Sequence, residues 1–209
     1  MLGRRIELSS SKFILCILVL ILGVTTLTAS AIPYGSGTYG SCQYGSCSIS
    51  VTSNSSVSLN VTPTTSGKCT IQNDVVQVLT DDSSGYTLSL VNSSSTSTAL
   101  SNGSNTIPAT SGTFSSPSAL TANTWGYRVD GWGNFTGGTT TAQNNISPPA
   151  TVFAGTPANT GSPGPDTIAS TATAADPAVS TKVWYGVCAS TSTTKGLYTA
   201  QITYSAVTN

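Results

Sequence analysis

The stretch KVWYGVCASTSTTKGLYTAQITYSAVT, residues 182–208, decides the fold because it reads as two β-strands joined by a polar loop. Successive side chains of a strand point to opposite faces of a sheet. One face of the second strand is apolar and the other is polar, which indicates a half-buried antiparallel strand. The apolar face holds Tyr198, Ala200, Ile202, Tyr204 and Ala206.

The first strand of this stretch, residues 183–188, is apolar on both faces, which indicates a central strand of a sheet. The linker, residues 190–196, is long for a tight turn but normal for a hairpin loop. The sequence therefore predicts a C-terminal β-hairpin.

The composition favours strands over helices. Ser and Thr together number 69 (34 plus 35) of the 209 residues, charged residues make up 7%, and there is no His. Thr, Val and Tyr suit a pleated sheet, whereas the helix formers Glu and Lys are scarce. Short strands separated by turn-forming clusters predict an all-β fold, a single antiparallel β-sandwich of immunoglobulin-like or jelly-roll character.

Strand signals recur along the chain, and no helical periodicity exceeds a turn or two beyond residue 31. The sequence Asp81-Asp82-Ser83-Ser84-Gly85 separates two such signals and predicts a second hairpin. We expect one β-sandwich domain over residues 48–209. The clearer signals are residues 48–52, 57–61, 69–80, 86–90, 124–129, 151–153 and 166–170, with weaker ones at 98–100 and 106–107.

Residues 1–31 have the three-part build of a secretory signal. A basic start precedes an apolar run, residues 13–27, and the small-residue site Ala29-Ser30-Ala31 follows. We expect a signal helix that is cleaved after Ala31, followed by a Gly/Ser/Tyr-rich N-terminal segment, residues 32–47. An uncleaved anchor is the alternative, but the run is short for a membrane span of about 20 apolar residues. The expected location is secreted or cell-surface, with membrane contact only through the signal before cleavage.

The charge of the exported chain argues against nucleic acid as a partner. Beyond residue 31, four basic and six acidic residues give a net charge of 4 − 6 = −2. No basic stripe exists that could release counterions from a phosphate backbone. The partners that we expect are other copies of the chain or glycans at a cell surface.

Four cysteines lie beyond the predicted signal: Cys42, Cys47, Cys69 and Cys188. In an exported chain an even number of cysteines argues for disulfides, and three pairings are open. We favour a local Cys42–Cys47 bridge and a Cys69–Cys188 bridge that spans 119 positions (188 − 69). A metal site at the CxxxxC pair is the alternative, but neither a His nor a second close pair accompanies it. We therefore expect no metal and no cofactor.

The aromatic segment TWGYRVDGWGNF, residues 124–135, is the most conspicuous candidate binding site. Exposed aromatic rings can stack on sugars, while Arg and Asp bind hydroxyl groups. The alternative, which we favour, places Trp125 and Tyr127 in the core and makes Asp130-Gly131 a turn. The candidate ligand contacts are Trp132, Phe135, Tyr127 and Arg128.

The sequence predicts no catalytic site, because the exported chain has neither His nor Glu and no phosphate-binding loop. Asp81 and Asp82 could begin a calcium site with Asp166 or Asp176, but the adjacent Ser-Ser-Gly favours an ordinary Asx turn. Six Asn-x-Ser/Thr sequons could accept glycans in a suitable host. They are Asn54, Asn60, Asn92, Asn102, Asn134 and Asn145.

Five blocks of the chain resemble a group of uncharacterised exported proteins of Saccharibacteria-like candidate-phylum bacteria. These blocks are SVSLNVTP (56–63), GYTLSL (85–90), NTWGYRVD (123–130), VWYGVCAS (183–190) and GLYTAQITYSAVTN (196–209). The similarity spans most of the exported chain and implies no activity. More loosely, the ends are similar to WxL-type, spore-coat or fimbrial-type surface domains, although no Trp-x-Leu pair is present. We expect a non-catalytic, secreted or cell-surface structural or adhesive protein, with a carbohydrate-binding module as the alternative.

Overall fold

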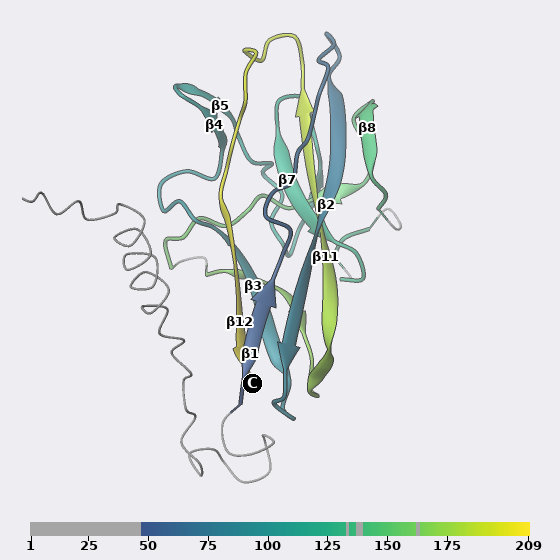
Figure 1. Ribbon diagram of the computed structural model, residues 1–209. Coiled ribbons are helices and arrows are strands. Elements are labelled where there is room, and N and C mark those ends of the chain that lie inside the picture. Colours follow the sequence, from purple (N-terminus) through teal and green to yellow (C-terminus); the bar gives the residue numbers. More distant parts are fainter. Residues whose placement is uncertain (1–46, 133, 137–139, 162–163) are drawn as a thin grey trace, which may run out of the picture. The chain divides into compact units, whose positions relative to one another are not determined.

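The computed structural model describes residues 47–132, 134–136, 140–161 and 164–209. The predicted signal and Cys42 lie outside these residues. The described part is all-β, with several antiparallel sheets and no helix that could cross a membrane (Figure 1). In chain order its strands are β1 (Ile49–Thr52), β2 (Lys68–Thr80), β3 (Tyr86–Asn92), β4 (Leu100–Asn102), β5 (Asn105–Ile107), β6 (Ser118–Ala119), β7 (Trp125–Val129), β8 (Gln143–Ile146), β9 (Val152–Phe153), β10 (Asp166–Ser170), β11 (Ala175–Ala189) and β12 (Ile202–Thr208).

The largest sheet has five strands and is built around the long antiparallel pair of β2 and β11. Its order is β1-β2-β11-β7, and β8 also pairs with β2. β11 is bonded to β2 along one edge and to β7 along the other. The prediction that the first strand of the C-terminal stretch is central is therefore confirmed.

A three-stranded sheet has the order β10-β3-β12, with antiparallel pairing throughout. β12 carries the predicted alternation, since Ile202, Tyr204 and Ala206 are half-buried and the residues between them are exposed. Two further sheets, β4-β5 and β6-β9, have two short strands each.

Both predicted hairpins are wrong. β11 and β12 belong to different sheets, and so do β2 and β3 on either side of the turn at residues 81–85. β2 and β7 occupy both edges of β11 over residues 183–187, the part nearest to the loop that leads to β12. Residues 190–201 carry the chain across to the three-stranded sheet.

Residues 57–61 do not form the predicted strand. Their side chains still alternate, and Val57, Leu59 and Val61 pack against the core as half-buried residues. β8 already occupies the neighbouring edge of β2 at Cys69 and Ile71, so this segment runs alongside without a ladder of its own.

The larger core cluster is shared by the five-stranded and the three-stranded sheets. Two phenol groups inside it connect these sheets. The Tyr185 hydroxyl on β11 lies 2.6 Å from the Tyr204 hydroxyl on β12. The Tyr127 hydroxyl on β7 donates to Asp166 Oδ2 on β10 at 2.6 Å. These two buried hydroxyls thus find partners across the core instead of losing hydrogen bonds.

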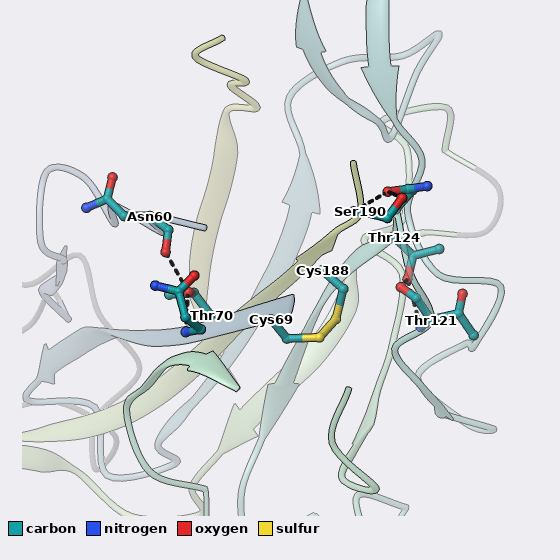
Figure 2. Close-up of a disulfide and its surroundings, with 9 residues drawn as sticks. Asn60, Cys69, Thr70, Thr121, Thr124, Cys188 and Ser190 are labelled. Atoms are coloured by element: carbon teal, nitrogen blue, oxygen red, sulfur yellow. Dashed lines mark hydrogen bonds between the residues drawn. A yellow bond between two sulfur atoms is a disulfide. The ribbon is translucent and has the colours of Figure 1, made fainter. Parts of the chain in front are cut away.

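A second core cluster lies on the other face of the five-stranded sheet and contains the predicted disulfide Cys69–Cys188 (Figure 2). The two cysteines face each other in register, and Cys188 N–H donates instead to Thr124 O on the β7 side. They therefore form a non-hydrogen-bonded pair, the kind in which side chains are closest. Beside them, a Cβ at Gly186 would lie 2.7 Å from Leu120 Cδ1 and 2.9 Å from Phe153 Cε1, so any larger residue would displace these side chains.

Ser48 and Asn209, the residues just before β1 and just after β12, both bind the turn at residues 81–85 (Figure 1). At its start, Ser48 N–H donates to Asp81 Oδ1 at 2.7 Å. At its end, Asn209 N–H donates to Gly85 O at 3.2 Å, and the Asn209 side-chain amide donates to Ser84 O at 3.2 Å. We call this end of the domain the base. The opposite end, where β2 starts and β11 ends beside the disulfide, is the distal end.

Replacing both bridged cysteines, C69A with C188A, should lower the free energy of unfolding by about 2–5 kcal/mol. A bridge that closes a loop of 119 positions restricts the unfolded chain strongly, and removing a native disulfide typically costs this much. Urea denaturation of the double variant beside the oxidised parent measures the difference. An unchanged midpoint would show that the bridge does not hold the distal end.

Candidate ligand groove beside Trp132

A groove of about 560 Å³ opens at the end of β7, between the turn that follows this strand and β10. Asp130 and Gly131 form this turn, as the sequence suggested, and Gly131 has a φ of 93° that suits glycine. Trp132 follows and is half-buried, with its indole N–H donating to Ile168 O on β10 at 2.6 Å. The hydrogen bond fixes the ring as one wall of the groove.

The opposite wall is the part of β11 that β7 does not cover. β7 pairs with β11 only from Val183 to Val187. The bond from Cys188 N–H to Thr124 O shows that even-numbered residues of β11 direct their backbone groups to the β7 side. By the same alternation, the backbone of Lys182 faces the groove. Exposed Ser170 and Ser180 add hydroxyl groups to the lining.

Arg128, one of the predicted ligand contacts, is buried and serves the fold. Its guanidinium binds Asp130 Oδ1 at 2.8 Å through Nη2 and at 2.9 Å through Nε. It also donates to the backbone oxygens of Thr136 and Val152. Because its donors are bound inside the protein, Arg128 does not reach the groove, and its prediction as a ligand contact is corrected.

Tyr127 and Phe135 are also buried, so they too are corrected as exposed ligand contacts. Tyr127 faces the core beside Trp125, as the favoured alternative predicted. Phe135 is 6% exposed and packs edge-to-face against Phe114 and Tyr127. The edge of β7 that does not pair with β11 is bridged by Ala154, and all five residues of the strand are buried. Of the four predicted contacts, Trp132 alone lines the groove.

Asp130 holds its charge more strongly than an ordinary aspartate. Burial on its own would raise its pKa, but hydrogen bonds from Thr140 and Arg128, together with the Arg128 charge, outweigh that effect and lower the pKa. Thr140 donates its N–H to Oδ2 at 2.7 Å and its hydroxyl to Oδ1 at 2.8 Å. The carboxylate beside the groove is therefore already bound by protein groups.

Asp166 behaves in the opposite way. Burial raises its pKa, and the hydrogen bond from Tyr127 only partly offsets that effect. Burial likewise raises the pKa of Tyr127, and the nearby Asp166 adds to the shift. A carboxyl group with a raised pKa binds more protons folded than unfolded, so its contribution to stability decreases as the pH rises through the folded pKa.

The acidic residues considered for calcium are used in turns and ladders. Asp82 Oδ1 accepts the N–H of Ser84 at 2.8 Å, which is the predicted Asx turn. Asp81 binds Ser48, and Asp166 binds Tyr127. Within the described ranges, no group of three or more Cys, Asp or Glu side chains converges on a metal-sized space.

Asn123 organises the distal end, and the sequence reasoning missed it. Its side-chain oxygen accepts the N–H of Ser190 at 2.8 Å and the hydroxyl of Thr193 at 2.6 Å. Its amide donates to Ser192 Oγ at 3.0 Å. Asn123 has a φ of 65°, which Asn tolerates better than most residues. The signal that could have identified Asn123 is its position in the turn just before the strand that begins at Trp125.

The six sequons differ in their exposure. Asn92 is 2% exposed and donates to Thr156 Oγ1, so the folded domain leaves no room for a glycan there. Asn102 is half-buried. The exposed ones are Asn54, Asn60, Asn134 and Asn145.

The substitution D130N should destabilise the domain by about 2–4 kcal/mol, because it weakens the charged partner of a buried guanidinium. The effect should depend on pH. The depressed pKa of Asp130 adds stability above the ordinary aspartate pKa of about 3.9, and this stability is lost as the pH falls. Urea midpoints of the parent and D130N should therefore converge at low pH. A constant difference across the pH range would contradict this account of Asp130.

The groove offers a fixed indole ring, hydroxyl groups and one ammonium group at Lys182, whereas its carboxylate is already bound. Such a lining can hold a neutral, hydroxyl-rich molecule by stacking and hydrogen bonds. No protein-family model, curated protein or solved structure matches this chain.

Proposed function

We propose that the protein is a non-catalytic structural or adhesive component, secreted or displayed at the cell surface, built on a single antiparallel β-sandwich of immunoglobulin-like or jelly-roll character. The observation that carries this proposal is the convergence of both ends of the domain on the turn at residues 81–85. A domain whose ends meet at its base presents its opposite end outward when it is attached at the base.

The distal end fits such a display. The Cys69–Cys188 disulfide joins the two central strands there, and around it lie loops rich in Ser and Thr (Figure 2). Asn123 connects these loops through four hydrogen bonds, to Ser190, Ser192 and Thr193. Hydroxyl and amide groups at this end could form hydrogen bonds, direct or through water, with another surface.

The disulfide also supports the proposed extracellular location. Disulfides persist in oxidising environments outside the cytosol. A buried bridge between central strands is consistent with an extracellular chain. The predicted signal at residues 1–31 gives the route by which the chain would be exported.

Cell fractionation of the producing organism tests this function, together with surface labelling of the variant T194C. Thr194 is exposed in the distal loop. A membrane-impermeant maleimide should label T194C on intact cells or in the medium, while the parent chain measures background from its own cysteines. Labelling that appears only after lysis would place the protein inside the cell and overturn the proposal.

A second function, carbohydrate binding, is favoured by the groove beside Trp132. The indole N–H is bound to Ile168 O, so the ring is held in place before any ligand arrives. Preorganised aromatic rings lose little conformational entropy on binding, which suits weak stacking on sugar faces.

If the groove binds polysaccharide, W132A should weaken that binding about tenfold, since losing a stacked ring costs about 1–2 kcal/mol. Isothermal titration calorimetry with soluble cell-wall and plant polysaccharides measures the affinity of each variant. Y198A is the matched control, because Tyr198 is a half-buried aromatic residue outside the groove. Equal affinity of W132A and Y198A, or no binding by the parent, would exclude the groove as a glycan site.

A further inference from the structure

β12 is the edge strand of the three-stranded sheet and pairs only with β3 among the described strands (Figure 1). The bonds Ser93 N–H to Gln201 O and Asn209 N–H to Gly85 O show that odd-numbered residues direct their backbone groups toward β3. The even-numbered residues of β12 therefore direct theirs away from the sheet. These outward backbone groups make no ladder with a described strand, although β1 of the five-stranded sheet lies next to β12.

This edge lacks the features that normally prevent edge-to-edge pairing. Its sequence, ITYSAVT, has no charged residue, no Pro and no Gly, and its register with β3 is continuous. Natural edge strands are usually protected by charges, prolines, bulges or a covering segment. The adjacent β1, ISVT, at the edge of the five-stranded sheet, is uncharged as well.

The other long edges of the described domain are protected. β10 has a register shift between Thr167 and Ala169, and Trp132 covers the carbonyl of Ile168. β7 is bridged by Ala154. The free edge of β11 carries the charged Lys182 and a register shift near Ala175. The contrast singles out β12 as the open edge.

We propose that β12 pairs with β12 of a second copy of this chain, antiparallel and about a two-fold axis at Ser205. This pairing deepens the proposed structural or adhesive function, on which it rests, by naming its partner. A two-fold axis brings the same strand together in antiparallel orientation. Centring it on Ser205 places all seven residues of β12, from Ile202 to Thr208, opposite the second copy.

The side chains in this register are compatible on both faces. On the exposed face, Ser205 meets Ser205, and Thr203 meets Val207, which is 61% exposed in one copy. On the half-buried face, Tyr204 meets Ala206. No like charges face each other, which would otherwise destabilise the pair. The partner is thus a second copy, because the strand is complementary to itself in hydrogen bonding, charge and size.

The register gives a direct test with single cysteines in the full chain, exported and purified, since Ser205 lies on the axis. The two Ser205 residues would form a non-hydrogen-bonded pair, the same kind that carries Cys69–Cys188 in this protein. Under mild oxidation S205C should therefore give a band of doubled mass on a non-reducing gel. T203C alone should not, because its copies would lie about 13 Å apart along the strands. A mixture of T203C and V207C should cross-link.

Controls separate this pairing from chance collision and from misfolding. T106C, on the exposed face of β5, reports random cross-linking, and the parent chain reports that of its own cysteines. S205K, which places two ammonium groups opposite each other, should shift the protein toward monomer in light scattering, whereas T106K should not. Circular dichroism should show that all variants are folded.

The proposal is overturned if S205C cross-links no more than T106C, or if S205C and T203C alone cross-link equally. Cross-linking of the purified protein does not depend on where the cell places it. A folded, surface-located chain that fails to cross-link would reject the β12 pairing alone, while a cross-linked chain found only inside the cell would reject the proposed display alone.

Discussion

The antiparallel pairing of β2 and β11 is the constraint on which the rest of the structure depends. These are the two longest strands, and their register runs from the disulfide at the distal end toward the base. β2 and β7 occupy both edges of β11 over residues 183–187, and β12 pairs with β3 in the other sheet. Because β2 bonds β1 near the base and β8 near the disulfide, residues 57–61 are left without a ladder. The topology thus follows from which strands pair with the edges of β2 and β11.

The two main sheets are joined by aromatic side chains with polar tips. Tyr127 and Tyr185 bury their rings from the five-stranded sheet and reach Asp166 and Tyr204 on the other sheet with their hydroxyls. The domain has few charged groups, and the buried Arg128 is bound to its neighbour Asp130. Burial of rings supplies the stabilisation, while each hydroxyl–oxygen contact fixes how one sheet sits on the other. A core of this kind leaves the surface free to be made almost entirely of hydroxyl and amide groups.

Side-chain periodicity predicted the strands well and their partners poorly. The strands predicted at residues 166–170 and 69–80 agree closely with β10 and β2. A strand that buries one face carries the signal in its own sequence, as a regular spacing of apolar residues. The predicted pairing of neighbouring strands was wrong at both hairpins, because strands that are close in sequence compete with distant strands for the same edge. The even number of cysteines predicted disulfides but left three pairings open, of which the favoured Cys69–Cys188 bridge is confirmed, whereas the burial of Arg128 and Phe135 was not predicted. That burial depends on contacts from other segments, such as Val152 O on Arg128 and Phe114 on Phe135, and the role of Asn123 depends on hydrogen bonds to residues 190–193.

Residues 48 and 209 lie beside the same turn, residues 81–85, which has a consequence for the order in which the strands could be connected. Ser48 and Asn209 bind the same few residues, so a short peptide could join them and new termini could be opened in an exposed distal loop. Domains with adjacent ends commonly tolerate such circular permutation and insertion into a host loop. The order in which the strands are connected would then change, while the shared edges of β2 and β11, and with them the fold, would stay the same.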